Sequence, residues 1–143
     1  MKTLVPYPDK CTGCRYCELI CSLVKENIII NLKMARLHVV KKNIAVDVPI
    51  VCTQCGACIP ACPTEAIYKK EDIILIDKDK CVSCGECIEA CPLRVIILDR
   101  DELADKCDLC NNDPYCVKFC TQGALKFEEK NEKQFEKMRA LMK

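Results

Sequence analysis

A cysteine pattern that recurs along this 143-residue chain is its most constraining feature. Three sets read Cys-x2-Cys-x2-Cys-x3-Cys, and a fourth set keeps the first and last gaps but widens the middle gap to five residues. Together the sets contain all 16 cysteines of the chain: Cys11, Cys14, Cys17, Cys21; Cys52, Cys55, Cys58, Cys62; Cys81, Cys84, Cys87, Cys91; and Cys107, Cys110, Cys116, Cys120. This proportion is well above ordinary usage, so the thiols must be a building element of the fold.

Dense cysteine in a short chain indicates disulfides, zinc or iron–sulfur clusters. No apolar leader follows Met1 and the apolar runs have strand length, so we expect a cytoplasmic protein whose thiols stay reduced. Structural zinc normally uses two Cys-x2-Cys pairs separated by a longer loop. Three cysteines at successive three-residue steps instead cover three irons of a cubane, and the fourth faces a different cluster. The spacing therefore predicts four 4Fe–4S clusters, with zinc or a mixed-metal array as the alternative.

The charge balance depends on this prediction. The formal net charge is +1 with neutral thiols. Each oxidised cluster with its four thiolates carries about −2, so four clusters add about −8 and bring the total to about −7. The tripeptide Asp-Lys-Cys opens three of the four sets, and we expect its lysines, Lys10, Lys80 and Lys106, to offset this buried negative charge. A chain of this charge gives no reason to expect nucleic acid as a partner.

The segments between the cysteine sets predict short strands and one helix. The apolar runs at 73–76 and 95–98 have the length of buried strands. Alternating segments at 36–40 and 44–48, around the polar residues 41–43, predict a β-hairpin. After residue 127, Phe135, Met138, Leu141 and Met142 share one helical face, which predicts an amphipathic helix that folds back on its own domain or docks another subunit.

No catalytic motif accompanies the cysteines. The sequence contains no nucleophile elbow, Walker loop or dinucleotide fingerprint. His38 is the only histidine, and its place in a predicted strand indicates a surface or packing residue. Every thiol is assigned to a cluster, which leaves none to act as a nucleophile. We therefore interpret the chain as a conductor of electrons that is not catalytic on its own.

The four cysteine sets carry a family resemblance. They are the run Cys-Thr-Gly-Cys-Arg-Tyr-Cys-Glu-Leu-Ile-Cys, the two sets that end in Cys-Pro, and the run Cys-Asp-Leu-Cys-Asn-Asn-Asp-Pro-Tyr-Cys-Val-Lys-Phe-Cys. These sets resemble the four-cluster ferredoxin-type subunits of molybdenum or tungsten bis-pterin oxidoreductases. The resemblance extends from Tyr7 to about Phe127. The pattern is most similar to the small polyferredoxin subunit of tungsten-dependent aldehyde oxidoreductases. The iron–sulfur subunit of tungsten-dependent benzoyl-CoA reductase is close to the same pattern.

The resemblance implies an α+β fold of two packed bacterial-ferredoxin-like dicluster halves. Residues 1–21 with 100–127 would form the outer half, 22–51 a hairpin insertion, 52–99 the inner half, and 128–143 the C-terminal amphipathic helix. In this family the first set pairs with the fourth and the second with the third, and each closing cysteine crosses to its partner's cluster. The implied ligand groups are Cys11, Cys14, Cys17 and Cys120; Cys107, Cys110, Cys116 and Cys21; Cys52, Cys55, Cys58 and Cys91; and Cys81, Cys84, Cys87 and Cys62.

The outer pair departs from the family motif. Ser22 follows Cys21, and Thr121 follows Cys120, where the motif has proline. The five-residue gap before Cys116 is also shorter than in many family members. If a crossed assignment fails, we expect the failure in this pair.

The resemblance also implies a function and partners. The chain would relay single electrons between a large tungsten- or molybdenum-pterin catalytic subunit, of aldehyde oxidoreductase type, and soluble ferredoxin or a flavin subunit in anaerobic metabolism. No membrane anchor is expected. Two alternatives stay open: a free-standing polyferredoxin, and the iron–sulfur subunit of a hydrogenase or formate-linked complex.

Overall fold

The computed structural model describes residues 2–26 and 31–142 and contains short helices and short strands. The helices are α1 (Tyr16–Lys25), α2 (Glu86–Ala90), α3 (Tyr115–Phe119) and α4 (Glu132–Met142), with 3-10 turns η1 (Pro8–Lys10) and η2 (Leu32–Met34). The strands are β1 (Lys2–Pro6), β2 (His38–Asn43), β3 (Val46–Ile50), β4 (Ile67–Lys70), β5 (Ile73–Ile76), β6 (Ile97–Leu98), β7 (Ala104–Asp105) and β8 (Leu125–Glu129). The predicted α+β class is confirmed.

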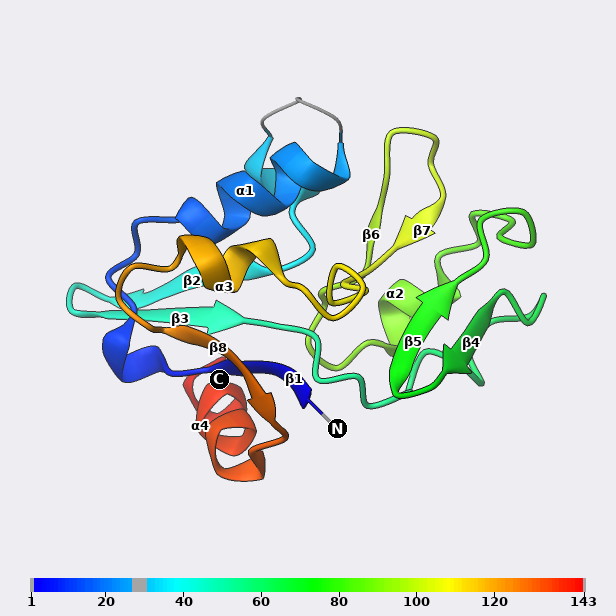
Figure 1. Ribbon diagram of the computed structural model, residues 1–143. Coiled ribbons are helices and arrows are strands. Elements are labelled where there is room, and N and C mark those ends of the chain that lie inside the picture. Colours follow the sequence, from blue (N-terminus) through cyan, green and yellow to red (C-terminus); the bar gives the residue numbers. More distant parts are fainter. Residues whose placement is uncertain (1, 27–30, 143) are drawn as a thin grey trace.

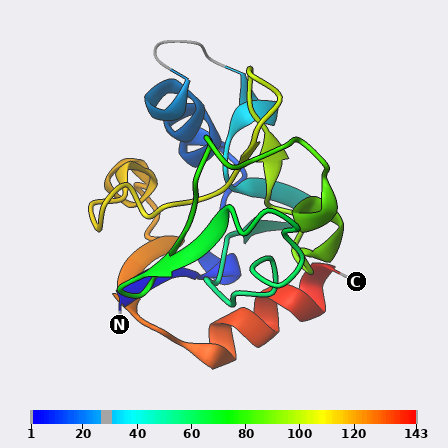
Figure 2. The same cartoon turned by 90° about the vertical axis from the view of Figure 1, so that its right-hand side faces the viewer.

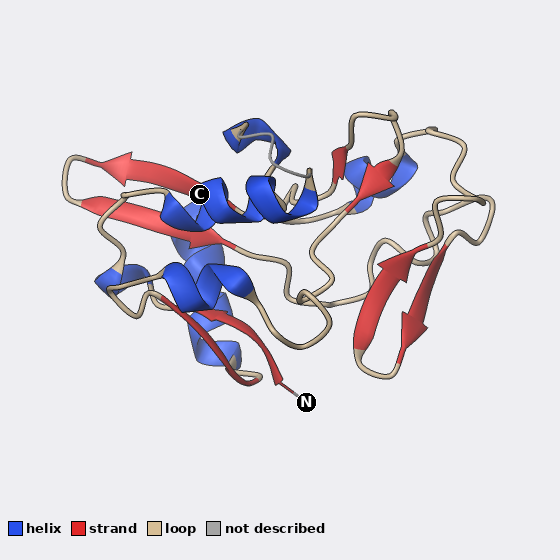
Figure 3. Ribbon diagram, turned by 45° about the horizontal axis from the view of Figure 1, so that its top comes forward, coloured by secondary structure: helices blue, strands red, loops and turns tan. Residues whose placement is uncertain are grey.

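The strands pair into four antiparallel two-stranded sheets: β1–β8, β2–β3, β4–β5 and β6–β7. The β1–β8 sheet joins segments far apart in sequence, because Lys2 pairs with Glu129 and Pro6 with Leu125. Figure 1 shows the consequence, with α1, α3, β1, β8 and the β2–β3 hairpin on one side of the molecule and α2, β4 and β5 on the other. Figure 3 shows the β4–β5 hairpin standing apart from the helices of the first group.

The predicted hairpin is present, but its turn lies further along the chain than expected. The strands are 38–43 and 46–50, so Lys41 and Lys42 belong to β2 and Ile44–Ala45 form the turn. The side-chain oxygen of Asn43 accepts a hydrogen bond from the Ala45 N–H at 2.9 Å, which closes the turn at this position. Residues 27–30 of the predicted insertion lie outside the described residues.

One of the two predicted apolar strands is much shorter than expected. Residues 73–76 form β5 as predicted, but of the run 95–98 only Ile97–Leu98 is a strand. Val95 and Ile96 are buried without strand pairing. Arg94, just before them, has a left-handed backbone with φ of 54°, so the chain is still turning where the apolar run begins.

The C-terminal helix folds back on its own chain. Phe135 and Met138 of α4 are fully buried, and the helix contacts β1, β2 and β3. Figure 2 shows α4 along one edge of the molecule. Leu141 packs against the core as predicted, whereas Met142 is exposed because it lies at the last residue of the helix. Among the described residues, no helix has the length and apolar content needed to cross a membrane.

Candidate metal centres

The 16 cysteines come together in four pockets with four cysteines each. The pocket volumes are about 360, 350, 280 and 310 Å³ for sites A, B, C and D, in that order. Site A is lined by Cys11, Cys14, Cys17 and Cys120; site B by Cys21, Cys107, Cys110 and Cys116; site C by Cys52, Cys55, Cys58 and Cys91; and site D by Cys62, Cys81, Cys84 and Cys87. These are the crossed groups that the family resemblance implied, including those of the outer pair.

Each pocket has a buried side and an exposed side. All of the cysteines are free thiols, with no disulfide among them. The third cysteine of every set is buried, namely Cys17, Cys58, Cys87 and Cys116. The second cysteine of the first three sets is exposed, namely Cys14, Cys55 and Cys84. The pockets are therefore at the surface on one side and continuous with the core on the other.

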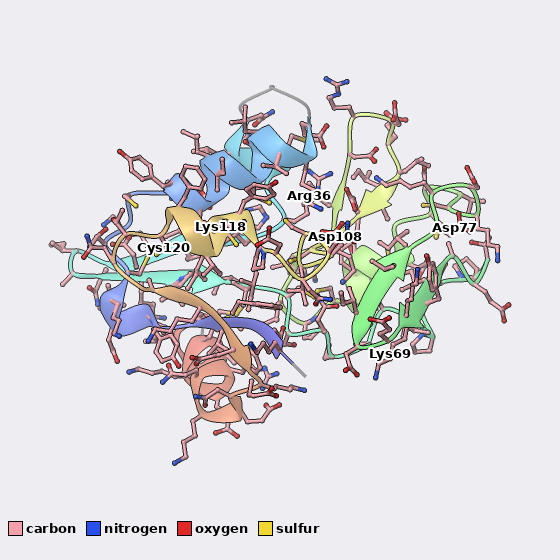
Figure 4. All side chains as sticks on the ribbon, viewed as in Figure 1. Arg36, Lys69, Asp77, Asp108, Lys118 and Cys120 are labelled. Atoms are coloured by element: carbon pink, nitrogen blue, oxygen red, sulfur yellow. The ribbon has the colours of Figure 1, made fainter. Side chains whose placement is uncertain are left out.

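Helical turns connect neighbouring pockets. In α1, Cys17 lines site A and Cys21, one turn later, lines site B. In α3 and its C-cap, Cys116 lines site B and Cys120 lines site A. α1 and α3 pack against each other, and Figure 4 labels Cys120 beside α3.

Of the two links between the inner pockets, sites C and D, only one is helical. α2 carries Cys87 of site D, and Cys91 of site C follows at the helix C-cap. Cys58 and Cys62 are joined by turns without a helix. Pro60 lies between them and lacks the N–H that a helical turn would use.

Burial favours the protonated form of half of these thiols when no metal is bound. Burial raises the pKa of Cys17 and of Cys107 to about 12, and that of Cys58 to about 11. The pKa of Cys62 is lowered instead, because hydrogen bonds from the Thr64 hydroxyl and nearby backbone N–H groups outweigh burial. Metal binding at these sites must therefore release protons.

Backbone N–H groups point at several of the sulfurs. Such bonds stabilise a thiolate and tune a bound metal. They run from Arg36 to Cys21 Sγ at 3.2 Å, from Gln54 to Cys52 Sγ at 3.4 Å, from Ala66 to Cys62 Sγ at 3.3 Å and from Ala104 to Cys81 Sγ at 3.5 Å. Sites B, C and D thus each contain at least one sulfur that accepts from the backbone.

The pocket linings favour an anionic occupant. Arg15 lines site A, Lys25 and Arg36 line site B, and Lys106 lines site C. No carboxylate is among the described residues that line the four pockets. Four thiolates around an oxidised iron–sulfur cubane carry about −2, so the linings fit this group.

The sulfurs surround a space without meeting at a point. Within the described ranges 2–26 and 31–142, no group of three or more His, Cys, Asp or Glu side chains is arranged to hold a single metal ion. Four soft sulfur donors spread around one pocket fit a multi-iron centre.

The three Asp-Lys-Cys lysines differ in the structure. Lys10 and Lys80 are exposed, whereas Lys106 is buried, with 3% of its surface accessible. Sequence reasoning treated the three alike and missed Gln54, which is buried beside Lys106 in the lining of site C. Nothing in the local sequence distinguishes the three lysines, because Gln54 comes from a different cysteine set.

Comparison with known proteins gives two matching family models, both described as 4Fe-4S dicluster domains, at residues 10–67 and 51–95. The polyferredoxin-like subunit of aliphatic sulfonate oxidoreductase from Pyrococcus furiosus is 39% identical over 77 residues, which are 51% of this chain and 44% of that protein. The respiratory nitrate reductase beta chain of a Bradyrhizobium species is 36% identical over 76 residues, 50% of this chain and 23% of that protein. The chain thus spans less than half the length of these relatives.

Solved structures cover more of the chain. A chain of the active-site complex BamBC of benzoyl coenzyme A reductase, as isolated, matches with a TM-score of 0.52 and 28% identity, over 99% of this chain and 87% of that one. The same complex with 1,5-dienoyl-CoA matches with a TM-score of 0.52 and 30% identity, over 89% of this chain and 75% of that one.

Proposed function

Because the chain belongs to the ferredoxin-like 4Fe–4S dicluster proteins, we propose that it is an electron-transfer subunit with one 4Fe–4S cluster in each of sites A to D. The observation that carries this proposal is the division of all 16 cysteines among four pockets, four to a pocket, with no thiol left over. A bound cubane supplies one-electron uptake and release. The chain itself holds the cluster, surrounds it with apolar side chains and cations, and tunes it through N–H···S bonds.

The arrangement of the sites supports a linear path in the order A, B, C, D. Sites A and B are joined by α1 and α3, and sites C and D by α2, in each case through cysteines one helical turn apart, about 5.4 Å along the axis. Between the pairs, the side-chain amide of Gln54 in the lining of site C donates to the Cys107 carbonyl at 3.1 Å, and Cys107 lines site B. In this proposal sites A and B form the outer dicluster half and sites C and D the inner half.

The proposed partners are a large tungsten- or molybdenum-pterin catalytic subunit, of aldehyde oxidoreductase type, and soluble ferredoxin or a flavin subunit. Support comes from what the similar proteins are called: a polyferredoxin-like oxidoreductase subunit, a nitrate reductase beta chain and the BamBC complex. The exposed cysteines of sites A, C and D support a route by which electrons enter or leave at the surface.

The proposal is tested by metal analysis of the protein purified without oxygen. We expect about sixteen irons and about sixteen acid-labile sulfides per chain. Stoichiometric zinc with little iron would refute the proposal. Tungsten, molybdenum or nickel in a co-purified complex identifies the class of the catalytic partner, and a monomer without any large partner indicates a free-standing polyferredoxin.

The crossed ligand groups are tested with paired serine variants. Cys21 and Cys110 line the same site, so Cys21→Ser with Cys110→Ser damages one cluster and leaves about twelve irons. Cys21→Ser with Cys14→Ser damages two sites and leaves about eight irons. Uncrossed ligation predicts the reverse order of iron contents for the two double variants, which would contradict the assignment.

A further inference from the structure

Lys106 is a buried cation at the junction of the two pairs of sites. It lies in the lining of site C and directly precedes Cys107 of site B. Its Nζ donates to Gln54 Oε1 at 3.0 Å, to the Ile74 carbonyl at 2.7 Å and to the Cys107 carbonyl at 2.8 Å. Three acceptors match the three N–H groups of an ammonium, so the geometry is that of the charged form.

The partners of Lys106 are all neutral. Its acceptors are one amide and two backbone carbonyls, and within the described part of the chain no carboxylate is within ion-pair distance of its Nζ. A charge removed from water needs a counter-charge nearby, or its burial is strongly unfavourable.

The other cations that line the sites differ in this respect. Arg15 pairs with Glu18 at 3.2 Å, Lys25 pairs with Asp108, and Arg36 pairs with Glu26 at 2.8 Å and with Asp105. Their charges are therefore largely neutralised by protein carboxylates. Lys106 is the lining cation without such a partner among the described residues, so its full charge acts on site C.

We propose that Lys106 is a positioning residue for the electron: its buried charge stabilises the reduced state of the site C cluster and makes site C the point in the relay where an electron resides. This inference rests on the proposed function. In the reduction one electron is added to the cluster and no bond of Lys106 changes, so its ammonium interacts with a cluster that is more negative by one charge. In a buried site this attraction is only weakly screened.

The position of Lys106 places the effect at site C in particular. Lys106 lines the pocket of site C together with its four cysteines. It is not among the residues that line site B, where the lining cations are Lys25 and Arg36.

The test is a redox titration of the four-cluster protein followed by electron paramagnetic resonance. Cys55→Ser changes a ligand of site C and so identifies its signal. For Lys106→Gln and Lys106→Met we expect reduction of that cluster to become at least tenfold less favourable, a midpoint lower by about 59 mV for a one-electron couple. Lys106→Arg retains the charge and should retain most of the midpoint. Lys80→Gln, the same change in the same tripeptide at an exposed position, is the matched control and should shift its nearest cluster much less.

The outcomes separate this inference from the proposed function. A neutral Lys106 variant with all four clusters and an unchanged site C midpoint overturns the role of Lys106 and leaves the relay intact. A wild-type chain without iron–sulfur clusters overturns the proposed function itself. If the neutral Lys106 variants do not bind all four clusters, Gln54→Glu provides the second test, because it replaces the Gln54 amide beside the Lys106 ammonium with a carboxylate. A fully loaded Gln54→Glu protein with a lower site C midpoint supports the role of Lys106, and an unchanged midpoint refutes it.

Discussion

At the scale of single residues, Gly13 shows how closely the first cysteine loop packs on the β2–β3 hairpin. Its φ is +74°, and a Cβ at this position would lie 2.7 Å from the carboxyl carbon of Asp47 in β3. Asp47 is nearly buried and pairs with Lys41 at 3.5 Å, so it has little room to move. Gly13 therefore serves two needs at once, a left-handed backbone and a close approach.

We predict that Gly13→Ala destabilises the holoprotein by roughly 1–3 kcal/mol more than Gly85→Ala. Gly85 is the matched control, because its φ is +77° but nothing lies within 4 Å of its added Cβ. Both variants share the strain of a left-handed alanine, so the difference isolates the contact with Asp47. The measurement is anaerobic chemical denaturation monitored by cluster absorbance. Equal midpoints for the two variants would mean that the Asp47 side chain moves away from the added Cβ at no energetic cost.

His38 predicts a pH dependence of stability. Burial lowers its pKa from the ordinary 6.5, Arg15 acts in the same direction, and Glu18, whose Oε1 is 4.0 Å from Nδ1, opposes them. The unfolded chain therefore binds more protons than the folded chain below pH 6.5, so this contribution to stability is complete above that pH and is lost as the pH falls.

We expect the unfolding free energy of the wild type to decrease as the pH falls below about 6.5, by no more than about 1.4 kcal/mol per pH unit from this residue. The variant His38→Gln should have a flatter profile over the same range. Denaturation midpoints measured at several pH values provide the check. A slope that is unchanged in the variant would assign the pH dependence to other groups.

At the scale of elements, Arg36 ties together segments that approach from different parts of the chain. It precedes β2, and it pairs with Glu26 at the end of α1 and with Asp105 of β7, which also lies 3.3 Å from Lys78. Figure 4 labels Arg36 in the region between α1 and the β6–β7 pair. Its side chain is 2% exposed, and its removal leaves Glu26 and Asp105 with only their more exposed partners, Arg100 at 3.5 Å and Lys78 at 3.3 Å.

We predict that Arg36→Met destabilises the protein by about 3–5 kcal/mol, because the buried Glu26 loses its closest cation. Arg94→Met is the matched control: Arg94 pairs with Glu89 at 3.3 Å, but both side chains are mostly exposed. This exposed pair should contribute no more than about 1 kcal/mol. Denaturation of both holoproteins tests the difference. Similar losses in the two variants would argue against a structural role for the Arg36 contacts.

The elements show which features local sequence can predict. The grouping of cysteines follows from spacing and the family pattern, because each ligand loop is short and its geometry is set by the gaps within it. The hairpin turn lies after the predicted residues 41–43, because the hydrogen bond from the Ala45 N–H to the Asn43 side chain outweighs the polarity of Lys41 and Lys42. Val95 and Ile96 differ from the predicted strand, because an apolar run has the same pattern whether it pairs or only fills the core. The burial of Lys106 depends on Gln54 and Ile74, from distant segments, so no local pattern could predict it.

At the scale of the whole molecule, the cysteines occupy much of the interior. Seven of them are buried within the hydrophobic core: Cys17, Cys52, Cys58, Cys87, Cys91, Cys107 and Cys116. Loss of the proposed clusters would therefore leave buried thiols with high pKa values in this part of the core.

We predict that the chain without clusters is unfolded. Cluster binding and folding are coupled, because the sites do not exist in the unfolded chain. Circular dichroism after chelation and oxidation, compared with the untreated protein, measures the loss. An apo chain that keeps the helical signal of the holoprotein would show that the polypeptide core is sufficient.

The clusters also change the charge of the molecule. The formal charge of +1 and the sequence pI of about 7.3 apply to neutral thiols. With four oxidised clusters the net charge is about −7, so the holoprotein should focus at a clearly acidic pH and bind an anion exchanger near pH 7. Native isoelectric focusing without oxygen checks this. A holoprotein that focuses near neutrality would contradict four clusters of this charge.

The antiparallel pairing of β1 with β8 has a consequence for biosynthesis. Sites C and D draw all their cysteines from residues 52–91, so their proposed ligands are complete once that segment has left the ribosome. Sites A and B combine the earliest cysteines, Cys11 to Cys21, with Cys107 to Cys120. Translation proceeds from the N-terminus, so the first thiols to emerge must wait for almost the whole chain. In the proposed assignment the inner pair can therefore receive iron and sulfide while the outer pair is still incomplete.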